Sequence, residues 1–263
     1  MIRRIWTVYL MELSKALRLK LTYVGPALVV LAVCAALLVR PVVRDGASDY
    51  GFIAYSTRMA QDLLGLLLLL MYCAGLVSSE LSSGSIRMVL VRPVKRWEFL
   101  GAKLMLGMSY AVVLTVLAGG SSWLLAFALG DVAGVSYGGE MIYTAQSMRN
   151  AYMVGALLSL APQFAAVGYA VMLSTWTRNT GAAIATAIGL WVILDTVKYS
   201  LGVAPYLFLT YLETPWEVFS AHSEVMDATW FPVAKYCLIT SSASLVLFVF
   251  VAGRILTLRD LNA

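Results

Sequence analysis

The segment from Ser79 to Lys103 holds the residues of this chain that are best suited to binding chemistry. Its basic residues outnumber its acidic ones, since Arg87, Arg92, Lys95, Arg96 and Lys103 stand against Glu80 and Glu98. Arginine forms directed hydrogen bonds to carboxylate and carbonyl groups, and the apolar run Met88, Val89 and Leu90 is suited to a groove on another protein. The pattern therefore favours recognition of a partner surface.

Catalytic chemistry has little support in the rest of the sequence. The single histidine, His222, is followed by Glu224 and Asp227, but a metal site needs three or four convergent ligands, so we expect a polar turn and no metal. The sequence has no HExxH and no GxxxxGK[ST] motif. We expect a chain that is not an enzyme and binds no cofactor itself, with an intramembrane enzyme kept as an alternative.

The elements around the basic segment are apolar enough for a membrane. Hydrophobic residues make up 61% of the chain and charged residues 13%, unlike a soluble domain. Uniformly apolar runs of this length predict helices, because a chain in lipid must satisfy its own backbone hydrogen bonds. The six predicted spans are 21–39, 59–77, 104–129, 152–175, 182–197 and 236–256. The fold class expected is an all-α integral membrane protein with six transmembrane helices in a single transmembrane domain, 1–263.

The distribution of charge predicts the orientation of these spans. Six spans place both termini on one side, together with loops 78–103 and 176–181, and that side carries thirteen of the nineteen basic residues. Basic residues in short loops stay in the cytoplasm, so we expect both termini there. Most of these residues flank spans, which favours lipid headgroups over nucleic acid as their partner.

Residues 1–20 form an amphipathic pattern that precedes the first span. At about 100° per residue the apolar and basic side chains separate onto opposite faces. The apolar face holds Ile2, Ile5, Trp6, Tyr9 and Leu13, and the basic face holds Arg4, Lys15 and Arg18. This predicts an elbow helix lying on the inner leaflet, the alternative being a cytoplasmic extension of the first span.

Glycine and proline divide the basic segment into parts. Gly84 allows a tight backbone after the second span, and the stretch from Ser85 to Val91 is long enough for about two helical turns. Pro93 disfavours helix at the residue before it, so a new helix is expected to begin after Pro93 and continue into the third span. The prediction is a short cytoplasmic helix, a turn and a re-entry into the membrane.

This segment resembles the coupling region of the membrane subunits of type-2 ATP-binding-cassette (ABC) transporters. In that family an acidic residue closes the second span and is followed by a glycine, a leucine-containing turn, a proline, an arginine and a lysine. The matching residues here are Glu80, Gly84, Leu90, Pro93, Arg96, Gly101 and Lys103. The family often has threonine after the glycine, where this chain has Ser85 and keeps a hydroxyl.

The resemblance covers the whole chain in layout and implies an ATP-driven permease, expected to be an exporter in the cell membrane. It implies two separate ATPase subunits that bind ATP and magnesium, and a second copy or a sister permease. It also implies a coupling helix between spans two and three, a second contact at Arg178, and short extracellular helices before span six. The residues assigned to ATPase coupling are Glu80, Gly84, Ser85, Arg87, Met88, Leu90, Arg92, Pro93, Arg96, Lys103 and Arg178.

The segment 198–235 is the second unusual region outside the spans. It contains three prolines and eight aromatic residues, which is typical of short re-entrant or interfacial helices at a membrane boundary. In the resembling family such helices cap the pathway. An aromatic belt with no gating role is the other interpretation.

Few ionisable or strongly polar groups fall within the predicted spans. Asp62 is expected at the outer boundary of span two, and Asp195 and Lys198 are spaced to pair. Gln163 beside Pro162 is the most central polar site, and these two residues either line a pathway or pack against a neighbouring span. A secondary carrier, the other alternative, would show central charges and inverted repeats. Sparse central charge favours an amphipathic or apolar cargo.

Overall fold

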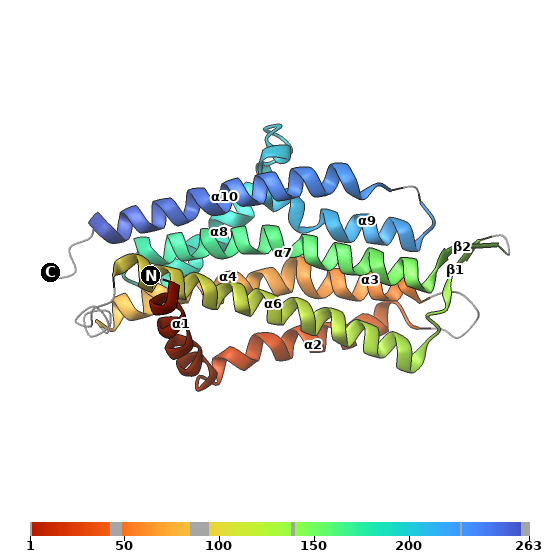
Figure 1. The fold of residues 1–263 in the computed structure, drawn as a ribbon, viewed down its shortest axis with the longest axis horizontal. Coiled ribbons are helices and arrows are strands. Elements are labelled where there is room, and N and C mark those ends of the chain that lie inside the picture. The colour runs from red at the N-terminus through yellow and green to blue at the C-terminus, as the bar shows by residue number, and fades with distance from the viewer. Residues whose placement is uncertain (1, 43–48, 85–94, 138–139, 227, 259–263) are drawn as a thin grey trace.

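The computed structural model describes residues 2–42, 49–84, 95–137, 140–226 and 228–258. These residues form an elongated bundle of long helices (Figure 1). Six helices are long and apolar enough to cross a membrane, as the sequence predicts. They are α2 Leu21–Val39, the continuous run Tyr50–Ser82, α6 Arg96–Leu129, α7 Ala145–Trp176, α8 Thr180–Val197 and α10 Trp230–Leu258.

The bundle has two distinct ends along its long axis. The N-terminal helix α1, Ile2–Leu17, the end of α4 and the start of α6 lie at one end, which we call the loop end (Figure 1). The other end carries a two-stranded antiparallel hairpin of β1 Gly134–Tyr137 and β2 Glu140–Thr144, and we call it the hairpin end. This hairpin was not predicted, so the fold is mostly but not entirely helical.

The second span is longer than its hydropathy predicts. It consists of α3 Tyr50–Met59, a π-helical turn at Ala60–Gly65 and α4 Leu66–Ser82. Its first residues are less apolar than the predicted span but are covered by protein, since Tyr50, Ile53 and Thr57 are buried. Protein contacts, which hydropathy cannot register, therefore extend this helix toward the hairpin end. Asp62 lies well inside it, which corrects the prediction of a boundary position.

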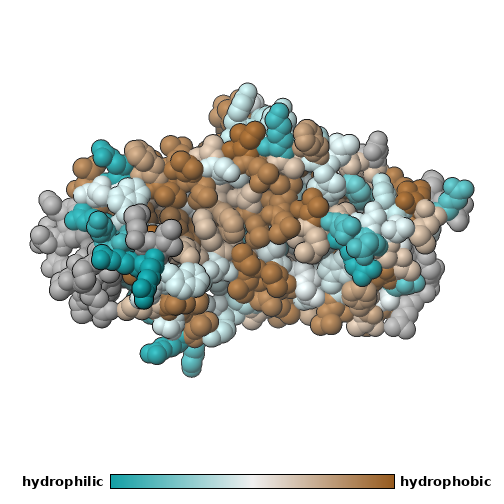
Figure 2. Space-filling model, in the orientation of Figure 1, coloured by the Kyte–Doolittle hydropathy of each residue, from teal (hydrophilic) through white to brown (hydrophobic). Residues whose placement is uncertain are grey.

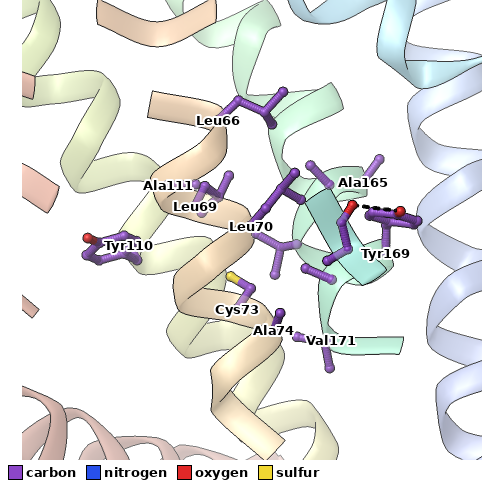
Figure 3. Packing of buried hydrophobic residues seen from close by; sticks show 14 of the residues in the cluster. Leu66, Leu69, Leu70, Cys73, Ala74, Tyr110, Ala111, Ala165, Tyr169 and Val171 are labelled. Atoms are coloured by element: carbon purple, nitrogen blue, oxygen red, sulfur yellow. Dashed lines mark hydrogen bonds between the residues drawn. The ribbon is translucent and has the colours of Figure 1, made fainter. Parts of the chain in front are cut away.

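Helices α4, α6 and α7 meet in the main core of the bundle. Leu69, Leu70 and Cys73 of α4 are fully buried, and Figure 3 shows them between the helices that carry Ala111 and Ala165. Gly107 of α6 allows this close approach, because a Cβ there would lie 2.6 Å from Val167 and 2.9 Å from Cys73.

The segment between α8 and α10 folds into three short helices. They are η2 Ala204–Tyr206, η3 Phe208–Leu212 and α9 Thr214–Ser223, and α9 packs against α7 and α3. Trp216 and Phe219 of α9 are fully buried among aromatic residues at the hairpin end. The segment thus contains short helices before the last span, and their extracellular position stays a prediction.

The surface in Figure 2 separates polar from apolar residues along the long axis. Hydrophobic residues form a broad band across the middle of this face, and hydrophilic residues gather mainly to either side. This distribution fits a multi-pass membrane protein, whose apolar side chains meet lipid at mid-height.

Candidate functional site: two charged clusters in a helical bundle

Four charged residues form a network at the loop end, which we call the loop-end cluster: the buried Glu12, Glu80 and Lys103, and the exposed Lys15. The Lys103 ammonium donates hydrogen bonds to Glu80 Oε1 at 2.7 Å and to Glu12 Oε2. The Lys15 ammonium donates to the same Glu80 oxygen, also at 2.7 Å. The side chains of Lys103 and Glu80 are only 3% and 4% exposed. One lysine thus joins α1, α4 and α6.

The loop-end cluster is balanced in charge, with two cations and two anions. Two opposite charges that are buried together stabilise each other, because burying an unpaired charge has a high cost in free energy. Burial acts to lower the pKa of Lys15, but the Glu80 and Glu12 carboxylates outweigh it and raise that pKa, so Lys15 stays charged at neutral pH. The network therefore connects three helices through hydrogen bonds between oppositely charged side chains.

The start of α6 is attached to the end of α10 through two further contacts. Arg96 donates hydrogen bonds to the backbone carbonyls of Leu256 at 2.7 Å and Thr257 at 2.8 Å, in the last turn of α10. A cation at a helix C-terminus satisfies carbonyls that lack an intrahelical partner. The Trp97 ring packs on Gly253, and a Cβ there would collide with the ring.

The structure places the other predicted coupling residues in three groups. Gly84 has φ +68°, a left-handed conformation that suits glycine after a helix. Arg178 is exposed between α7 and α8, far from Gly84 in sequence. Ser85, Arg87, Met88, Leu90, Arg92 and Pro93 lie outside the described residues, as does the predicted helix 85–91. The predicted helix after Pro93 is confirmed, since α6 begins at Arg96 and is continuous to Leu129.

Helix α1 packs on α6 mainly through its predicted apolar face, with Trp6 as the exception. Tyr9 is buried and its hydroxyl is 2.8 Å from Ser109 Oγ of α6, and Ile5 contacts Gly101. Trp6, however, is 51% exposed. Of the other predicted elbow residues, Leu13 is partly buried, whereas Arg4, Lys15 and Arg18 are exposed. The side chain of Ile2 lies outside the described residues. The helix packs on α6 while keeping apolar side chains on its outer surface.

A chain of polar side chains crosses the middle of the bundle. Thr115 Oγ1 donates to Gln163 Oε1 at 3.1 Å, and Gln163 Nε2 donates to Gln61 Oε1 at 3.2 Å. We call these three residues the amide chain. The neighbouring Pro162 frees the carbonyl of Leu158, to which the Cys237 thiol of α10 lies at 3.8 Å. Both predicted pathway residues therefore make contacts between helices.

A second charged cluster lies nearer the hairpin end, and we call it the mid-bundle cluster: Arg58, Asp62, Glu213 and Glu217. Arg58 Nε donates to Asp62 Oδ2 at 2.8 Å, while its Nη2 contacts Glu213 at 3.4 Å and Glu217 at 3.3 Å. One arginine faces three carboxylates, so the cluster has a formal net charge of −2. The π-helical turn places Asp62 in it, and such turns occur often at functional sites.

The remaining predicted polar residues have simpler environments. Lys198 donates to Asp195 at 2.7 Å, which confirms the predicted pair. His222 lies in α9 instead of a turn, is partly buried, and stacks near Trp230. Its Nδ1 is 2.8 Å from the Val218 carbonyl. Within the part of the chain that the structure describes, no three His, Cys, Asp or Glu residues gather as metal ligands.

Sequence reasoning missed the partners of several of these groups. Glu12 was not among the predicted site residues, yet its carboxylate accepts a hydrogen bond from Lys103, 91 residues further along the chain. Glu213 and Glu217 lie in the aromatic segment, and their contact with Arg58 spans more than 150 residues. The signal available in the sequence was a charged residue inside an apolar span, because such a residue requires a partner of opposite charge.

Fold and clusters together define a multi-pass helical membrane protein with charged contacts between its spans. The chain belongs to the family DUF2705, described as "Protein of unknown function", whose model matches residues 12–261. A comparison with curated proteins gave no match.

Proposed function

We propose that this chain is the permease subunit of an ATP-driven ABC exporter, in the cell membrane with both termini cytoplasmic. It would form the translocation pathway as a dimer, with a second copy or a sister permease, and two separate ATPase subunits would supply ATP hydrolysis. The motif of the basic segment and the six-span layout support this proposal. The observation that carries it is the loop-end cluster, which joins both ends of that segment to α1.

A coupling loop must transmit movement to the membrane helices without yielding. Glu80 lies at the start of the basic segment and Lys103 at its end, and the hydrogen bond between them connects the two ends. Arg96 extends the connection to the end of α10. A displacement of the segment would therefore move α1, α4, α6 and α10 together, because packed helices shift as units instead of deforming.

The first test is whether an ATPase purifies with the chain. The full-length protein, tagged at its C-terminus, is isolated from its native membranes in a mild detergent, and bound proteins are identified by mass spectrometry. We expect an ABC ATPase in near-equal amount with the chain. A stand-alone carrier or a membrane enzyme predicts none, and its absence would overturn the proposal.

The second test asks whether the basic segment is the contact. Arg87→Glu reverses a charge within the segment and should reduce the recovered ATPase at least fivefold. Lys20→Glu is the matched control, because Lys20 is exposed at the same end of the bundle but outside the segment. Equal recovery with both variants would contradict the assignment of the contact while leaving the first result intact.

A further inference from the structure

A groove opens on the side of the bundle between α2 and the second span, close to the mid-bundle cluster. Its volume is about 490 Å³, within the range of sites for small organic molecules. Most of its walls are apolar, and Arg58 and Asp62 form its one charged side. Its apolar lining consists of Ala32, Tyr55, Met59, Leu63, Leu64 and Leu67.

The position of the groove makes it accessible from lipid. Leu63 is 59% exposed and Met59 39% exposed, and both lie on helices that are long and apolar enough to span a membrane. An amphipathic molecule dissolved in the bilayer would thus reach the groove sideways, without first crossing water.

The charge beside the groove determines whether a cationic or an anionic ligand is favoured there. Arg58 is already bound by Asp62, Glu213 and Glu217, so the cluster as a whole keeps an excess of negative charge. Lys198 is engaged by Asp195 and does not contribute to this balance. Electrostatic interactions are strengthened where water is scarce, so the excess attracts cations and repels anions.

Two buried polar atoms next to the cluster also lack partners among the described residues. Asp62 Oδ1 and Gln61 Nε2 are buried without a hydrogen bond, and both side chains line a small cavity that adjoins the groove at Asp62. Gln61 is only 8% exposed. A buried polar atom without a hydrogen-bond partner has a cost in free energy unless another molecule forms that hydrogen bond. This points to a ligand or a water molecule at this place.

We propose that the groove between α2 and the α3–π-turn segment binds an amphipathic monocation. Its positive group lies beside the mid-bundle cluster, where the Tyr55 ring offers an additional cation–π contact. Its alkyl part lies along Leu63, Leu64 and Leu67. The site requires no ATPase, so this proposal and the permease proposal stand or fall separately.

Photo-crosslinking tests the proposal with a probe of defined chemistry. The full chain is placed in phosphatidylcholine nanodiscs with a dodecyltrimethylammonium analogue that carries a diazirine in its alkyl chain, and labelled peptides are mapped by mass spectrometry. We expect labelling at residues 59–67 and around Ala32. A dodecyl sulfate analogue with the same diazirine should label these positions at least fivefold less.

Substitutions then distinguish the contribution of the acidic side chains to binding from that of the shape of the groove. Glu217→Gln should reduce labelling by the cation about threefold, with Glu224→Gln, an exposed acid beyond the same helix, as the control. Asp62→Asn should reduce it about tenfold, and the exposed Glu217 keeps the test valid if the buried substitution disturbs folding. Leu63→Trp fills the groove and should abolish labelling, whereas Leu124→Trp, on an exposed face of α6, should not.

Two results would overturn the proposal. Equal labelling by the cationic and anionic probes would show that the groove is merely a lipid-facing hollow. Cation labelling that persists unchanged in both Glu217→Gln and Asp62→Asn would show that the cluster does not recognise the positive group.

Discussion

The two charged clusters of this bundle contain the same kinds of residue but differ in balance and burial. In the loop-end cluster two lysines meet two glutamates, and the central pair, Lys103 and Glu80, is almost wholly buried. In the mid-bundle cluster one arginine meets three carboxylates, and the side chains of Glu213 and Glu217 are 43% and 52% exposed. A charge-balanced network with an enclosed central pair is suited to fastening helices, whereas an unbalanced cluster with two accessible carboxylates is suited to attracting a ligand.

Removing Lys103 should give the largest effect on stability. Lys103→Met keeps much of the side-chain length but leaves Glu12 without its lysine and Glu80 with Lys15 alone, at a cost of about 3–5 kcal/mol for breaking a buried pair. Thermal unfolding of the purified protein measures it. Lys95→Met, an exposed lysine at the start of α6, is the control. An unchanged melting temperature in Lys103→Met would remove the distinction between the two clusters.

Close packing at the loop end should be nearly as sensitive. Gly253→Ala places a methyl group into the Trp97 ring, and we expect a loss of about 1–3 kcal/mol from overpacking. Gly189→Ala is the matched control, because nothing lies within 4 Å of a Cβ at Gly189 and alanine favours a helix. If both variants melt alike, the contact between α6 and α10 is looser than the structure indicates.

Breaking the amide chain should cost a similar or slightly smaller amount. Gln163→Leu leaves Gln61 Oε1 and Thr115 Oγ1 without their partner, and we expect a total loss of about 1–3 kcal/mol, the range for an unsatisfied buried group. The double variant Gln163→Leu with Gln61→Leu should recover part of the loss, because it removes one orphaned group. Denaturation of the purified variants compares them, and a double variant less stable than the sum of both single effects would argue against a shared network.

The mid-bundle cluster should respond least in stability. Glu217→Gln removes one exposed member of an ion pair, and exposed pairs contribute less than about 1 kcal/mol. We therefore expect a melting temperature close to that of the unmodified protein, measured in parallel with Lys103→Met. A large loss would show that this cluster fastens helices too, and would weaken the case for a ligand there.

Much of the architecture was predictable because hydropathy acts locally. The limits of α2, Leu21–Val39, were predicted without error, since lipid-facing apolar residues fill that helix throughout. The second span began nine residues earlier than predicted, because Tyr50–Arg58 is covered by α9 and α6 instead of lipid. The hairpin at 134–144 was missed, since its few residues depend on pairing with each other and on Val135 packing inward.

The charged pairs also fall into those that the sequence could predict and those that it could not. The pair of Asp195 and Lys198 could be predicted, because residues three apart on a helix are neighbours. The bonds from Lys103 to Glu12 and from Arg58 to Glu217 join residues that are distant in sequence, and no local rule selects those partners from fourteen acidic residues.

The sequence by itself determined the six spans, the basic segment between the second and third of them, and the scarcity of charge within the spans. These features follow from the length and apolarity of each run, which do not depend on its neighbours. Only the tertiary structure decided which charges distant in sequence pair, that the loop-end cluster is neutral, and that the mid-bundle cluster retains excess negative charge beside a groove. Pairing depends on which helix faces pack together, and that is a property of the whole bundle.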